Sequence, residues 1–187
     1  MLRNSSRLRR VGRRIPNLRI PPLCFLSGDL RILSFNGQGI CVTDVVARKR
    51  CLDYVQSLAV SRHVLCFQEV HGLERDVVLT LTGCLPGWGV FVSSCTHVDG
   101  CFNPAAGGVA ICICPQLVNS YTCKSLAVVP GRCLAVSCSL DHNILTITNI
   151  HNAALHAKDV WTVRHHLKGI RTRDCEDPTS SFSVLLG

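Results

Sequence analysis

Three patterns are missing from this sequence, and each absence argues against a class of protein. No run of apolar residues approaches the roughly 18 that a membrane-spanning helix requires, so we do not expect the chain to cross a membrane. No secretory signal is visible, which predicts a reducing intracellular compartment, cytoplasmic or nuclear. No repeat recurs at the period of a solenoid, so one domain is expected for a chain of 187 residues.

Cysteine pairs at zinc-binding spacing are also missing, although the chain contains 13 cysteines. No Cys-x-x-Cys motif occurs, and Cys112 and Cys114 would project from the same face of a strand. This spacing argues against a structural zinc site. Most of the cysteines lie in apolar runs such as Ala110 to Pro115, where a free thiol behaves as a small core residue.

Acidic residues are absent from residues 1–28, which carry seven arginines. Of the net charge of +8, only +1 therefore belongs to the rest of the chain. We interpret this segment as a disordered leader, because prolines at 16, 21 and 22 interrupt helix formation. An arm that contacts nucleic acid and an organelle-targeting leader are the alternatives, since both are rich in arginine and poor in acid.

Apolar periodicity predicts one α+β domain of packed sheets and covering helices over residues 29–187. A helix capped by Thr43 is expected to run to about Ala59, with Val45, Leu52 and Val55 on its apolar face. Further helices are expected near 73–81 and over 154–170. Strands are expected at 30–35, 64–67, 89–93, 109–114, 123–129, 133–140, 144–150 and 182–186. The first two strands flank a helix, which favours parallel pairing.

Three polar residues stand at the ends of predicted strands: Asn36, Glu69 and His151. A carboxylate that emerges from a buried strand is a good Mg²⁺ ligand, because this ion prefers one or two carboxylates and completes its octahedron with phosphate oxygens and water. A solvated or salt-bridged glutamate would occupy the same kind of position. The local sequence decides between these two interpretations.

The segments Arg31 to Gly39 (RILSFNGQG) and Leu65 to His71 (LCFQEVH) resemble the first two motifs of the endonuclease/exonuclease/phosphatase superfamily. In that family one strand ends in Asn and a later strand ends in Gln-Glu. Gly107 to Ile111 (GGVAI) is similar to its glycine-led central strand, and Asn149 to Asn152 (NIHN) is similar to its Asn-hydrophobic-His/Tyr strand end. Four such motifs occur in the family's order.

The resemblance implies a DNase-I-like four-layer α/β sandwich that is incomplete at the C-terminal end. Ser183 to Gly187 (SVLLG) is similar to the strand that leads into the family's Gly-Asp-x-Asn motif, and this chain stops on that glycine. The missing Asp and Asn would orient the attacking water, and a later Asp-His pair would supply the active-site histidine. We therefore expect an incomplete catalytic set.

By the same resemblance, Glu69 would hold Mg²⁺ (or Mn²⁺), Asn36 would assist at the metal or the phosphate, and His151 would donate to a phosphate oxygen. Together these groups would neutralise charge as water displaces an alkoxide. Each has a structural alternative: Asn36 fits a turn, and His151 fits a capping or solvated histidine.

Other polar residues are weaker candidates. Asn149 is expected to brace neighbouring loops. Arg132 lies in a Gly-Arg turn that resembles a family feature, and its side chain would either contact a substrate phosphate or have a structural role. His165 and His166 fall on a predicted helix face, where solvent exposure is the simpler interpretation. The family gives His71 no clear role.

The favoured function is a divalent-metal-dependent phosphodiester hydrolase acting on DNA. The segment Gln68 to His71 is most similar to the endonuclease domains of non-LTR retroelements. A histidine at position 151 resembles instead the DNase-I-like and sphingomyelinase-like branches. A phosphatase or phospholipase of the same superfamily, and a non-catalytic remnant that binds nucleic acid through its leader, are the alternatives. Nucleic acid is the expected partner, with no obligate protein partner evident.

Overall fold

A computed structural model of the chain describes residues 30–38, 40–94, 107–119, 121–140, 143–152, 155–176 and 181–186. The basic leader predicted at 1–28 lies outside these residues, as do the turn predicted at Asp141 and His142 and the loop containing Asp177 and Pro178. In the described part, no helix is both long and apolar enough to span a membrane.

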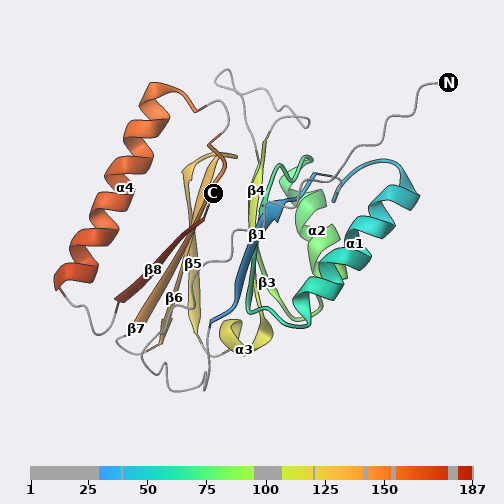
Figure 1. Cartoon of the computed structure of the whole chain (residues 1–187), viewed down its shortest axis with the longest axis horizontal. Helices are drawn as coiled ribbons and strands as arrows, with labels where there is room; N and C mark the ends of the chain where they lie inside the picture. Colours follow the sequence, from blue (N-terminus) through green and yellow to red (C-terminus); the bar gives the residue numbers. More distant parts are fainter. Residues whose placement is uncertain are drawn as a thin grey trace.

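Two four-stranded sheets form the centre of the molecule (Figure 1). The first has the order β1-β2-β4-β3, in which β1 and β2 are parallel and the other neighbours antiparallel. The second has the order β5-β6-β7-β8, and only its last pair is parallel. The strands are β1 (Ile32–Asn36), β2 (Val64–Gln68), β3 (Gly89–Ser93), β4 (Val109–Ile113), β5 (Thr122–Val129), β6 (Cys133–Leu140), β7 (Asn143–Ile150) and β8 (Ser181–Leu186).

Helices cover the outer faces of both sheets, so the layers run helix, sheet, sheet, helix (Figure 1). Helices α1 (Val45–Ala59) and α2 (Glu74–Cys84) pack on the first sheet, and α4 (Ala157–Glu176) packs on the second. This arrangement confirms the predicted α+β sandwich. A short helix that the sequence did not indicate, α3 (Pro115–Val118), follows β4.

Strand β2 is buried on both faces, which explains its uninterrupted apolar sequence. Val64 and Cys66 face the core between the two sheets, whereas Leu65 and Phe67 face α1 and α2. Cysteines fill both layers as small apolar residues, as expected: Cys66, Cys84, Cys112, Cys114, Cys133 and Cys138 are buried.

The boundaries of the three predicted helices differ from the expected ones, and α2, expected near 73–81, spans Glu74–Cys84. Asp44, not Thr43, caps α1, because its carboxylate accepts hydrogen bonds from the backbone N–H groups of Val46 and Ala47. Val45, expected on the apolar face, is 67% exposed, since the first turn precedes the part of α1 that contacts the sheet. Helix α4 begins at Ala157 and continues to Glu176, whereas the predicted helix spanned 154–170.

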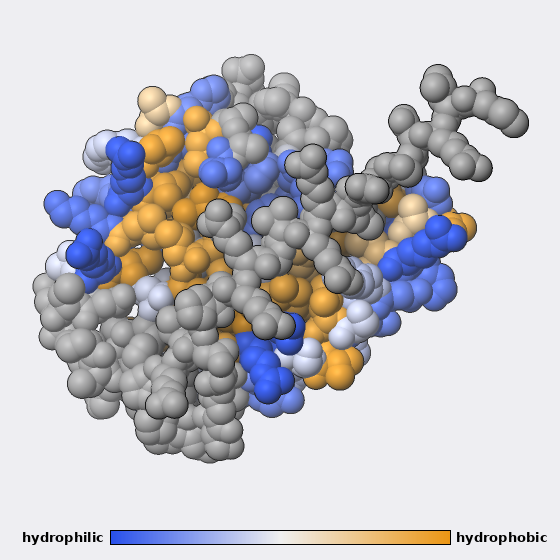
Figure 2. All heavy atoms as spheres, in the orientation of Figure 1, coloured by the Kyte–Doolittle hydropathy of each residue, from blue (hydrophilic) through white to orange (hydrophobic). Residues whose placement is uncertain are grey.

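Apolar side chains remain exposed at both edges of the second sheet. Leu126 on β5 and Leu185 on β8 are 56% and 55% exposed. Figure 2 shows hydrophilic residues along α4, at the left of the view, with apolar residues exposed beside them. Helix α4 therefore covers the middle of this sheet more completely than its edges.

Candidate active site

The candidate site lies where β1, β2 and β7 end. Asn36 ends β1 in register with Gln68 of β2, so Glu69 follows at the same edge of the sheet. The Nδ2 atom of Asn36 donates to Oε2 of Glu69 over 2.9 Å. The Nε2 atom of His151, directly after β7, lies 3.3 Å from Oε1 of the same carboxylate. Three side chains singled out at separate strand ends thus meet at one carboxylate.

Glu69 has an unusual backbone conformation for a residue with a side chain. Its φ of 57° lies in the left-handed region, and it is the one non-glycine residue with positive φ in the described part of the chain. This conformation costs roughly 1–2 kcal/mol for a residue with a Cβ atom. It reverses the chain, so that the N–H of Val70 donates to the carbonyl of Gly108, 3.2 Å away.

Asn36 presents the donor end of its amide to Glu69. Its Oδ1 atom accepts a hydrogen bond from the backbone N–H of Gln38 over 2.8 Å, which forms an Asx turn. The turn leaves no room for a larger residue at Gly37, where a Cβ atom would approach Ile40 and Val70 to 2.9 Å. Local hydrogen bonding therefore fixes the direction of the Asn36 side chain.

Arg132 joins the cluster from the turn between β5 and β6. Its guanidinium lies 2.7 Å from Nδ1 of His151, and its backbone carbonyl accepts from the N–H of His151, also over 2.7 Å. A Cβ atom at Gly107 would lie 2.9 Å from this guanidinium, so the glycine allows the arginine to approach the end of β4. The structure therefore gives Arg132 a contact with His151, and its contact with a substrate phosphate stays a prediction.

Two effects lower the pKa of His151. Burial is the larger, because it disfavours the charged imidazolium, and the positive charge of Arg132 acts in the same direction. The carboxylate of Glu69 opposes both effects, and His71 is close enough to contribute a small lowering. The net lowering of the pKa favours the neutral imidazole of His151. The side chains of His151 and Glu69 are 12% and 28% exposed.

Asn149 is completely buried and joins the two sheets. Its Nδ2 atom donates to the carbonyls of Phe67 on β2 and Ala110 on β4, over 2.9 and 3.1 Å. Its Oδ1 atom accepts from Nε2 of Gln68, which also contacts Oγ of Ser34 at 2.8 Å. Asn149 was expected to brace neighbouring loops, but its partners show that it braces the strands β2 and β4 instead.

Sequence reasoning did not identify Gln68 and Ser34 as members of this network. The register of the strands could have identified them. Gln68 lies opposite Asn36, and Ser34, two residues before Asn36 on β1, points to the same face of the sheet. His165 and His166 lie on α4, outside the cluster, and His165 stacks on the exposed Trp161 with ring centroids 5.1 Å apart.

The cluster offers one carboxylate to a cation. Among the described residues, no group of three or more His, Cys, Asp and Glu side chains could hold a metal ion. Mg²⁺ does not require such a group, because one carboxylate, phosphate oxygens and water can complete its coordination. The partly exposed carboxylate of Glu69, with both oxygens at the edge of the sheets, fits that mode.

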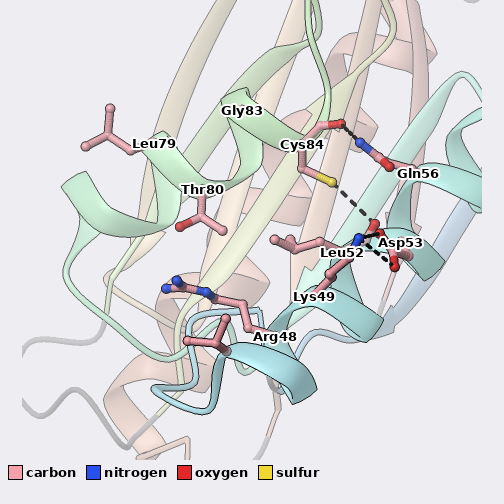
Figure 3. Close-up of a pocket in the computed structure, with 10 residues that line it drawn as sticks. Arg48, Lys49, Leu52, Asp53, Gln56, Leu79, Thr80, Gly83 and Cys84 are labelled. Atoms are coloured by element: carbon pink, nitrogen blue, oxygen red, sulfur yellow. Dashed lines mark hydrogen bonds and ion pairs between the residues drawn. The ribbon is translucent and has the colours of Figure 1, made fainter.

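A groove between α1 and α2 is separate from this cluster (Figure 3). Two pairs of its polar groups contact each other: Lys49 lies 3.3 Å from Asp53, and Gln56 donates to the carbonyl of Cys84 over 3.0 Å. None of the residues lining the groove belongs to the Glu69 cluster. The chemically organised surface is therefore the one at the strand ends.

Comparison with known proteins identifies the fold. No protein-family model matches the sequence, and no curated protein matches it. Solved structures do match over 83% of the chain. They include the AP endonuclease LMAP from Leishmania major (14% identity, TM-score 0.60), a humanized D. rerio TDP2 with 14 mutations (16%, 0.52) and D. rerio TDP2 complexed with a single-strand DNA product (15%, 0.51).

These similarities confirm the predicted DNase-I-like fold. The chain spans 54%, 60% and 58% of the three matched chains, in the order given above. At these identities the likeness establishes the architecture alone.

Proposed function

We propose that this chain carries the metal-binding and phosphate-binding part of a divalent-metal-dependent phosphodiester hydrolase that acts on DNA. The observation that carries the proposal is the convergence of Asn36 and His151 on the two oxygens of Glu69, at 2.9 and 3.3 Å. The three residues come from strand ends in both sheets, so their meeting is a property of the tertiary structure.

Glu69 is proposed to hold Mg²⁺ or Mn²⁺, which supplies charge neutralisation at the scissile phosphate. Asn36 orients the carboxylate through its Nδ2 atom and would assist at the metal or the phosphate. His151 donates its Nε2 proton to a phosphate oxygen as negative charge develops there. Arg132 contributes a fixed positive charge next to His151 and can donate to the same phosphate.

DNA is the favoured substrate because of charge as well as fold. The chain carries a net charge of +8, of which +7 lies in residues 1–28, and positive charge attracts the phosphate backbone irrespective of base sequence. The motif Gln68 to His71 supports an endonuclease of retroelement type within this superfamily. For residues 1–28, contact with DNA is one proposal, and a disordered or organelle-targeting leader is the alternative.

Metal binding is the first test, because it needs only residues in the cluster. Titration with Mn²⁺, followed by electron paramagnetic resonance, is expected to give a site that Glu69→Gln abolishes. Glu74→Gln is the matched control, because Glu74 is an exposed carboxylate on α2 outside the cluster. Unchanged Mn²⁺ binding in Glu69→Gln would overturn the proposed metal site.

Nicking of supercoiled plasmid tests the chemistry itself. For a version of the protein extended through the Gly-Asp-x-Asn motif, the expected result is metal-dependent nicking that Glu69→Gln abolishes and Glu74→Gln preserves. Binding of Mn²⁺ and of plasmid without any nicking would instead support the non-catalytic nucleic-acid-binding function. Release of inorganic phosphate or phosphocholine from small substrates, with no effect on plasmid, would favour the phosphatase or phospholipase alternative.

A further inference from the structure

Two cysteines lie directly opposite each other in the second sheet. Cys123 on β5 pairs in register with Cys138 on β6, and their sulfur atoms are 3.1 Å apart. Directly opposed residues of antiparallel strands have Cα atoms roughly 4.5–5.5 Å apart. This separation falls within the range of about 4.4–6.8 Å that a disulfide spans. The backbone is therefore already placed for a covalent bond between the two sulfurs.

The two thiols differ in access and in acidity. Cys123 is half-buried on β5, an edge strand of its sheet (Figure 1). Cys138 is fully buried in the core between the sheets. The hydrogen-bonded contact between the two sulfur atoms lowers the pKa of Cys123, and that contact together with burial raises the pKa of Cys138. Burial also raises the pKa of Cys66 and Cys112. Cys123 thus has the features of an attacking thiol.

We propose that Cys123 and Cys138 form an oxidation site at which hydrogen peroxide converts the two thiols to a disulfide. The Cys123 thiolate attacks one peroxide oxygen, the O–O bond breaks, and hydroxide leaves and takes up a proton to become water. The sulfenic acid on Cys123 is then attacked by the sulfur of Cys138, which forms the S–S bond and releases a second water. Two thiols and one peroxide give one disulfide and two waters.

The disulfide would act on the hairpin that carries Arg132. It closes a loop over residues 124–137, whose turn places Arg132 against His151. Closing a loop of this length restricts the unfolded chain. We therefore expect oxidation to raise the Tm by roughly 5–10 °C. A reductant should reverse the shift.

Peptide mapping of the full chain identifies the bond. The folded, reduced protein is treated with hydrogen peroxide, alkylated under non-reducing conditions and digested with trypsin. Because no Lys or Arg occurs between Arg75 and Lys124, Cys123 lies in peptide 76–124, and Cys138 lies in peptide 133–158. A disulfide-linked pair of these two peptides, 2 Da lighter than their summed masses, is expected.

Substitutions assign the two sulfurs. Peptide 133–158 also contains Cys133, and peptide 76–124 also contains Cys84, Cys95, Cys101, Cys112 and Cys114. The linked pair should disappear in Cys123→Ser and persist in Cys114→Ala and in Cys133→Ala. Cys123→Ser changes a half-buried edge position and is expected to fold. Persistence of the linked pair in that variant, or its absence from the oxidised wild-type chain, would overturn the proposal.

Discussion

The guanidinium of Arg132 contacts Nδ1 of His151 across 2.7 Å, which fixes the tautomer of the histidine. Guanidinium groups donate and do not accept, so Nδ1 must be the acceptor. A neutral His151 then carries its proton on Nε2, which faces Oε1 of Glu69. Arg132 therefore positions the proton that His151 is proposed to donate, in addition to any contact of its own with phosphate.

Removing the Arg132 side chain should weaken the proposed chemistry. Arg132→Met is expected to lower the rate of metal-dependent nicking roughly 10²-fold, the typical effect of losing one oriented donor. Arg132→Gln should lose less, because its amide can donate to Nδ1. The ¹⁵N chemical shifts of His151 provide a readout independent of activity: the Nε2-protonated tautomer should dominate in the wild type and lose that dominance in Arg132→Met. Arg50→Met, at an exposed site on α1, serves as the control.

The positive φ of Glu69 predicts that a substitution can preserve or raise the stability of the fold while it removes metal binding. Asparagine adopts positive φ more readily than glutamate, so Glu69→Asn should relieve strain at the φ of 57°. We expect its free energy of unfolding to equal that of the wild type or exceed it by up to about 1 kcal/mol. Mn²⁺ binding should be lost at the same time. Urea denaturation checks the first statement, and destabilisation by more than about 1 kcal/mol would contradict it.

Asn149 should be the most stability-sensitive polar residue of the cluster. Asn149→Ala leaves the carbonyls of Phe67 and Ala110 buried without this donor and removes the acceptor of Gln68. The expected loss of unfolding free energy is about 2–4 kcal/mol. Asn143→Ala, near the start of the same strand, should cost less than about 1 kcal/mol. Equal losses for the two variants in urea denaturation would argue against the bridging role.

Two glycines give opposite predictions for the same substitution. Gly107→Ala places a Cβ 2.9 Å from the Arg132 guanidinium, at a φ of 72°. This substitution should lower the free energy of unfolding by about 1–2 kcal/mol and, like Arg132→Met, reduce the rate of nicking. Gly83→Ala lies on α2, where an added Cβ meets nothing within 4 Å. It should stabilise the protein by about 0.5–1 kcal/mol. Thermal melts of the two variants should therefore shift in opposite directions.

His63 should make the fold sensitive to acid. Its Nδ1 atom accepts from the backbone N–H of Arg31 over 3.0 Å, and burial, followed by the charge of Arg31, lowers its pKa. The unfolded chain binds the proton first, with a pKa of about 6.5, so stability is retained above that pH and falls as the pH drops toward the lower folded value. His63→Asn keeps an acceptor but cannot titrate. Its unfolding free energy should fall less between pH 7 and 5 than that of the wild type.

Local patterns predicted most of the elements. The strands β3 and β6 have the expected bounds, and β2 differs by one residue, because alternation and flanking breaks are local properties. The cap of α1 was misassigned to Thr43, since Thr and Asp are both good caps and only the backbone geometry selects Asp44. Helix α3 is a single turn, too short for a periodic signal.

The sequence by itself determined which residue types stand at the strand ends, and so the identity of Asn36, Glu69 and His151 as candidates. It could not show that Gln68 reaches Asn149, 81 residues away, or that Arg132 fixes the proton of His151. Those contacts depend on how two separate sheets stack and on the space that Gly107 leaves for the Arg132 side chain. Side-chain types follow from the local sequence, whereas contacts between distant residues exist only once the sheets have packed.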